Sequence, residues 1–128
     1  MNHPSRLFAV GCVLLALAVA LGAFGAHGLK PMLVTTGRAE TFETAVKYHF
    51  YHALGLLALA MWAKNTPVQQ QKILMRAGWI LLAGVGIFAG SLYLLCIGQI
   101  TWLGAITPLG GVLMIVGWLY AAWQLVRH

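Results

Sequence analysis

The stretch LFAVGCVLLALAVALGAFGAHGL, residues 7–29, decides the fold of this chain, because it contains no Asp, Glu, Lys or Arg. An apolar run of about 20 residues crosses a hydrocarbon core of ~30 Å as a helix. The apolar core of a cleaved signal peptide is shorter, at roughly 7–15 residues, so we interpret this run as a membrane span. The chain is therefore expected to fold in lipid.

Three more apolar stretches follow, at residues 48–63, 77–97 and 104–126. With 61% hydrophobic and only 8% charged residues, the composition is too apolar for a soluble domain. Together the four stretches predict an all-α fold, an integral membrane four-helix bundle that forms a single transmembrane domain of residues 1–128. Residues 38–47 carry helix-forming and charged residues, and they predict a short amphipathic lead into the second span.

The basic residues predict how the bundle lies in the membrane. With four spans, one side would carry Arg6, Lys64, Lys72, Arg76 and Arg127, and the other Lys30, Arg38 and Lys47. The larger set is expected on the cytoplasmic side, so both termini are predicted to be cytoplasmic in the plasma (bacterial inner) membrane. The net charge of +6 does not indicate a nucleic-acid partner, because these residues are scattered at helix ends.

Smaller features of the sequence give further expectations. Ala83, Gly86 and Gly90 include the GxxxG spacing, which lets a neighbouring helix pack closely. The five tryptophans are expected as anchors at the membrane interfaces. Cys12 and Cys96 fall at opposite ends of the membrane, so they are expected to be two buried free thiols.

Proline and glycine residues mark the expected helix ends. Residues 32–37 are expected to form a short polar link, and Thr66 and Pro67 suggest the N-cap and first residue of the third span. Pro108 with the Gly110–Gly111 pair fits two alternatives: a broken helix of the kind that lines transporter sites, or an ordinary first helical turn.

Polar residues within the spans gather at one depth. At 1.5 Å per residue, nearly all of them fall in the outer half of the membrane. Polar side chains inside a bilayer face the protein interior or a wet cavity, so we expect an outward-opening polar pocket that includes a contact between His27 and Glu43. The candidate binding residues are His27, Glu43, Lys47, His49, His52, Ser91, Tyr93 and Thr107.

His49 and His52 are three residues apart and resemble part of a metal or haem site. A bare HxxH without a third ligand is explained more simply if each histidine satisfies a neighbouring hydroxyl or carbonyl group. Glu43 and Lys47, four apart, form an ordinary intrahelical pair. We therefore predict no catalytic residue, no metal site and no cofactor.

Four segments carry a family resemblance: ALGAFGAHGL (20–29), FETAVKYHFYHALGLL (42–57), GSLYLL (90–95) and LGAITPLGGVLMIVGW (103–118). They resemble the YgdD-like small membrane proteins, a family of unknown function numbered 423. The resemblance implies a few-pass helical membrane protein, and it brings no activity, substrate or cofactor. It also implies glutamine at the position of His49 in relatives, which weakens a shared HxxH metal site.

Three classes of function remain open. The first, which we expect, is a non-enzymatic binding or assembly protein of the lipid bilayer, as a possible homo-oligomer with an unknown small ligand or lipid. The second is a small oligomeric transporter or channel that uses protonatable His27, Glu43 and His52, but the inner half offers few polar residues for such a path. The third is a metal-binding or haem-binding redox protein, which lacks a third ligand fixed by spacing.

Overall fold

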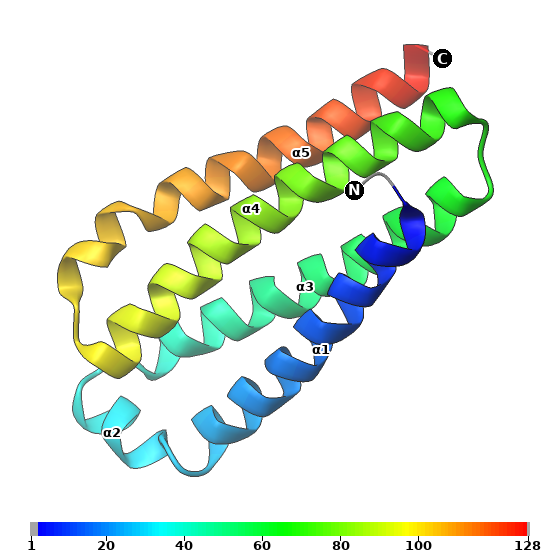
Figure 1. The fold of residues 1–128 in the computed structure, drawn as a ribbon. Coiled ribbons are helices and arrows are strands. Elements are labelled where there is room, and N and C mark those ends of the chain that lie inside the picture. Colours follow the sequence, from blue (N-terminus) through cyan, green and yellow to red (C-terminus); the bar gives the residue numbers. More distant parts are fainter. Residues whose placement is uncertain (1–2, 128) are drawn as a thin grey trace.

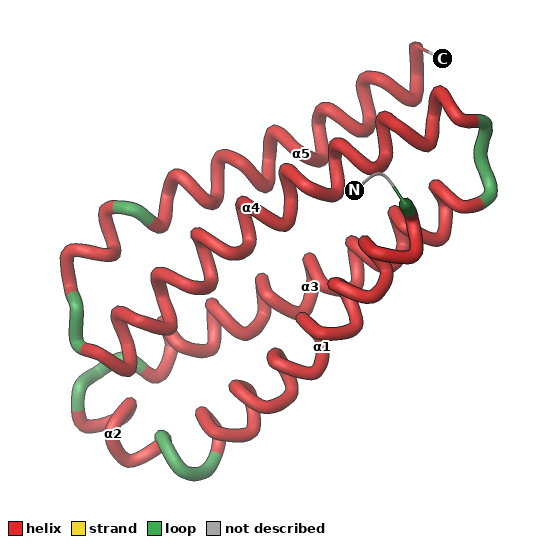
Figure 2. Tube along the Cα trace, in the orientation of Figure 1, coloured by secondary structure: helices red, strands yellow, loops and turns green. Residues whose placement is uncertain are grey.

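A computed structural model describes residues 3–127, and nearly all of this chain is helical (Figures 1 and 2). Its elements, in chain order, are α1 (Pro4–Ala26), α2 (Lys30–Thr35), α3 (Ala39–Lys64), α4 (Val68–Gly98), the short 3-10 helix η1 (Thr101–Ala105) and α5 (Thr107–Arg127). The described range contains no β-strand. The predicted all-α class is therefore confirmed.

The long helices lie side by side in an antiparallel row, in the order α1, α3, α4, α5 (Figure 1). The first turn of α1 and the last turn of α5 lie at the same end of the helices (Figure 1). Extensive contacts join α1 to α3, α3 to α4, and α4 to α5, whereas α1 touches α4 much less. A closed four-helix bundle is therefore not confirmed, because the described helices form an open row.

Three segments are long and apolar enough to cross a membrane: α1, α4 and residues 101–127, with mean hydropathy of 2.7, 2.3 and 1.7. The expected second span is instead part of α3, a single helix of 26 residues. The amphipathic lead at residues 38–47 runs without a break into this helix, as predicted. The polar residues of that lead make α3 less hydrophobic than its neighbours.

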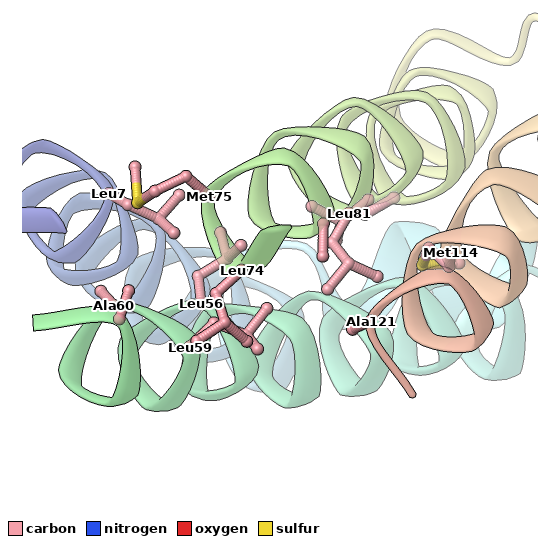
Figure 3. Close-up of a cluster of buried hydrophobic side chains, with 13 residues drawn as sticks. Leu7, Leu56, Leu59, Ala60, Leu74, Met75, Leu81, Met114 and Ala121 are labelled. Carbon is pink, nitrogen blue, oxygen red and sulfur yellow. The ribbon is translucent and has the colours of Figure 1, made fainter. Parts of the chain in front are cut away.

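The core is formed by side chains of α1, α3, α4 and α5 (Figure 3). Leu7, Leu56, Leu74, Met75 and Leu81 are fully buried there. Leu7 packs directly over Gly78, so a Cβ at that glycine would lie 2.5 Å from the leucine side chain. Close packing of this kind drives helix association in lipid, where the hydrophobic effect contributes little.

Glycines bring α4 and α5 into backbone contact. A Cβ on Gly110 would meet the backbone nitrogen of Phe88 and would lie 2.7 Å from the carbonyl oxygen of Gly84. Pro108 lies in the first turn of α5, and the helix continues through Gly110 and Gly111. The alternative of a broken helix at this point is therefore wrong, because α5 is continuous there and Gly110 packs against α4.

The connections differ from expectation in several places. Residues 32–37 were expected to form a polar link, but most of them belong to the helix α2. Pro31 lies in the first turn of this helix, where proline is well tolerated. Pro67 is the N-cap of α4 and not its first residue, and the Thr66 hydroxyl donates to the Ala63 carbonyl at 3.2 Å. Both cysteines are free, as predicted, but only Cys96 is buried, because Cys12 lies on the outer surface of the row.

Candidate functional site

The candidate residues do not share one pocket. They form separate groups, and the three hydrogen-bonded pairs each join two helices. His49 with Tyr93 links α3 to α4. His52 bonds to Trp118 of α5, and Ser91 bonds to Thr107. The predicted single polar pocket is therefore divided by helix packing.

His49 is the candidate with unused hydrogen-bonding capacity. It is 5% exposed, and its Nδ1 lies 2.8 Å from the hydroxyl oxygen of Tyr93. The two rings meet edge to face, with centroids 5.8 Å apart. Its second nitrogen, Nε2, is buried without a hydrogen-bond partner among the described residues.

A hollow of about 200 Å³ adjoins this pair between α1 and α4. His49 and Tyr93 are the two polar side chains in its lining. The walls are leucines of α1, such as Leu17, and the small residues Gly86 and Gly90 of α4. Leu17 and Gly86 are exposed, so the hollow opens sideways, toward the surface that would face lipid.

Gly86 and Gly90 differ from the other glycines of α4. A Cβ built at either position meets no described atom within 4 Å, whereas one at Gly78 or Gly84 would collide with a neighbour. The GxxxG stripe was predicted to pack against a helix, but within residues 3–127 it is uncovered. The reason is that α1 touches α4 at Leu7 and Gly78 and makes few contacts with it elsewhere.

His52 is fully hydrogen bonded. Its Nδ1 lies 2.9 Å from the carbonyl oxygen of Tyr48, and the indole nitrogen of Trp118 donates to its Nε2 at 3.2 Å. The carbonyl requires a proton on Nδ1 and the indole requires a free acceptor at Nε2, which together define a neutral imidazole. His52 therefore has a structural role that joins α3 to α5.

Ser91 and Thr107 form a second link between helices. Their hydroxyl oxygens are 2.6 Å apart, and both side chains are buried between α4 and α5. The Ser91 hydroxyl also lies 3.0 Å from the Phe88 carbonyl oxygen, and the Thr107 hydroxyl 3.2 Å from the Leu103 carbonyl oxygen, so two hydroxyl protons are shared among three contacts. Both hydroxyl protons are used in these contacts. The pair therefore links α4 to α5 and has no donor left for a ligand.

The charged candidates lie on the surface. Glu43 and Lys47 form an ion pair of 3.4 Å, and both side chains are more than half exposed. His27 caps the end of α1 and lines a shallow hollow with Phe24, whereas Glu43 lines a different hollow between α1, α2 and α3. The expected contact between His27 and Glu43 is therefore wrong.

The two histidines of the HxxH pattern bond to different helices. His49 is held by Tyr93 of α4 and His52 by Trp118 of α5. Across residues 3–127, no three His, Cys, Asp or Glu side chains gather closely enough to hold a metal ion. The geometry thus gives the metal or haem interpretation no support.

Sequence reasoning missed two parts of this arrangement. Trp118 was expected at a membrane interface, yet it lies midway along α5, against His52 and Gly55. Leu14 was not singled out, although it lines the same hollow as His49. No spacing signal links these residues, because they come from helices far apart in the sequence.

Long apolar helices, joined by buried polar pairs, define a helical membrane protein. The chain belongs to a family described as Protein of unknown function (DUF423), which matches residues 21–111. It is 43% identical over 119 residues to the UPF0382 membrane protein YwdK of Bacillus subtilis, covering 93% of this chain and 94% of that protein. It is 44% identical over 110 residues to a UPF0382 membrane protein of Staphylococcus saprophyticus, covering 86% and 88%. No solved structure matches.

Proposed function

We propose that this membrane protein binds a small ligand dissolved in the bilayer, in the hollow beside His49, and catalyses no reaction. One observation carries the proposal: His49 lines an apolar hollow, and its buried Nε2 has no hydrogen-bond partner in the described chain. A buried polar atom without a partner is unfavourable in a protein interior, and a ligand that pairs with it gains that free energy.

The lining of the hollow favours binding over catalysis. Besides His49 and Tyr93 it contains apolar side chains and glycine, and those two residues are bonded to each other. General acid–base or nucleophilic catalysis needs groups that exchange protons at a reacting centre. An apolar hollow with one free hydrogen-bonding group fits the recognition of an apolar molecule.

We further propose that α3 is a fourth span and that both termini are cytoplasmic. The helix lies between α1 and α4, which are both long and apolar enough to cross a membrane. Its 26 residues correspond to a length of ~39 Å at 1.5 Å per residue, enough for a ~30 Å core. Glu40, Glu43, Lys47 and Lys64 lie toward its two ends.

Self-association is the second candidate. The uncovered Gly86 and Gly90 stripe has the spacing that brings two membrane helices together. A helix of a second copy on this stripe would close the hollow from the lipid side. Binding of a small ligand and formation of a homo-oligomer therefore compete for the same face of α4.

The test is to purify the protein from its own membrane and identify retained small molecules by native mass spectrometry. Gly86→Leu and Gly90→Leu fill the hollow, and neither Cβ meets a described atom within 4 Å. Ala122→Leu, on the exposed side of α5, is the matched control. We expect wild type and control to retain a ligand that the filled variants lose.

Two other outcomes refute ligand binding. If wild type retains only the phospholipids that the filled variants also retain, the hollow holds no ligand. If wild type is a dimer and the filled variants are monomers, with no small molecule in either, the stripe is an interface between copies.

A further inference from the structure

We propose that the ligand is a quinone-type molecule: an apolar ring that moves freely in the bilayer and carries a carbonyl oxygen, which accepts a hydrogen bond from Nε2 of His49. This inference rests on the ligand-binding function proposed above and names the chemistry of its ligand. It follows from the hydrogen bonds, size and depth of the hollow.

The hydrogen bonds assign the proton of His49. A neutral imidazole has one donor and one acceptor, and Nδ1 faces the hydroxyl of Tyr93. The Tyr93 hydroxyl has no other acceptor among the described residues, so it donates its proton to Nδ1. With Tyr93 donating to Nδ1, the proton is on Nε2, which has no partner among residues 3–127. The group without a good partner is therefore a donor, and a ligand must supply an acceptor.

The size and polarity of the hollow limit the ligand. At about 200 Å³ it is smaller than the roughly 300–1,000 Å³ that encloses a drug-sized molecule. It suits one substituted ring, while a longer apolar tail would lie along the open side at Gly86 and Gly90. No charged side chain lines it, so a charged ligand would find no counter-ion.

The depth of His49 separates a mobile quinone from a phospholipid. His49 is ten residues from the outer end of α3, or ~15 Å along a helix ~39 Å long. If α3 is centred in a ~30 Å core, the imidazole lies about 10 Å inside the hydrocarbon boundary. The ester carbonyls of phospholipids stay near that boundary. A quinone ring carries its carbonyl groups freely to this depth.

The experiment uses the full chain in nanodiscs of one phospholipid and measures equilibrium binding of duroquinone, with empty nanodiscs as the blank. Durene, which has the same methylated ring without carbonyl groups, is the matched probe. We expect one saturable duroquinone site per chain and binding of durene at least about tenfold weaker, because durene cannot accept the hydrogen bond.

Variants separate the donor from the shape of the site. His49→Phe is expected to weaken duroquinone binding about tenfold, whereas His49→Gln, which keeps an N–H donor, retains part of it. Gly86→Leu fills the hollow and is expected to abolish binding. His27→Phe makes the same exchange on the exposed end of α1 and should change nothing.

Equal affinity for durene and duroquinone, or no effect of His49→Phe in a folded variant, overturns the donor role and leaves the binding function standing. Absence of saturable duroquinone binding, although a ligand is retained on purification, overturns the quinone class alone. Nanodiscs of ether-linked lipid test the other carbonyl source. Equal duroquinone affinity there is expected, and tighter binding would assign the site to the phospholipid ester.

Discussion

The indole nitrogen of Trp118 on α5 donates a hydrogen bond of 3.2 Å to Nε2 of His52 on α3. Apart from this contact, α3 and α5 both pack against α4, which lies between them. The same indole ring covers Gly55, where a Cβ would lie 2.8 Å from it. One side chain therefore joins helices that are not neighbours in the row. His52 is held in place by it, with no capacity left for a ligand.

Trp118→Phe removes this hydrogen bond and keeps an aromatic ring. We expect a loss of about 1 kcal/mol in the free energy of unfolding, the usual size of such a bond between membrane helices. Unfolding in mixed detergent measures it. Trp123→Phe, on the exposed side of α5, is the control and should have little effect. An equal loss in both variants would mean that ring volume, and not the hydrogen bond to His52, stabilises the protein.

Glycines on the facing helices α4 and α5 are predicted to respond in opposite ways to the same substitution. Gly110→Ala places a methyl group against the backbone of Phe88 and Gly84, which cannot move aside, so we expect destabilisation of about 3 kcal/mol. Gly86→Ala and Gly90→Ala meet nothing and should be neutral in a monomer. Thermal unfolding in detergent compares them. Strong destabilisation at Gly86 would show that a helix of a second copy packs there.

The sequence was sufficient to predict the helical class, the membrane environment and the continuity of residues 38–47 with the second span. Those features depend on the local amino-acid composition and on the helical spacing of apolar residues. The sequence could not show that Gly86 is uncovered while Gly84 is packed, because both are glycines on one helix and the difference depends on the positions of α1 and α5. The separation of His49 from His52 has the same origin: the helices that supply their partners were not predictable from spacing.

The Ser91 and Thr107 pair predicts coupling between two substitutions. Ser91→Ala and Thr107→Val each remove one hydroxyl from a contact of 2.6 Å between α4 and α5. We expect each to lower the free energy of unfolding by roughly 1 kcal/mol, and the double variant to lose less than the sum. A double-mutant cycle in detergent measures this coupling. Additive losses would mean that each hydroxyl acts only through its own backbone carbonyl, at Phe88 and Leu103.

The proposed fourth span predicts which connections face the same side of the membrane. In a background of Cys12→Ser and Cys96→Ser, single cysteines replace Asn65, between α3 and α4, and Thr36, between α2 and α3. Both residues are exposed. If α3 crosses the bilayer with cytoplasmic termini, a membrane-impermeant maleimide labels T36C in intact cells and labels N65C only after permeabilisation.

Labelling of both in intact cells would place the two ends of α3 on one side, and α3 would then not be a span. Labelling of N65C alone would keep the span and reverse the orientation, because the basic residues at Lys64, Lys72 and Arg76 would then face outward.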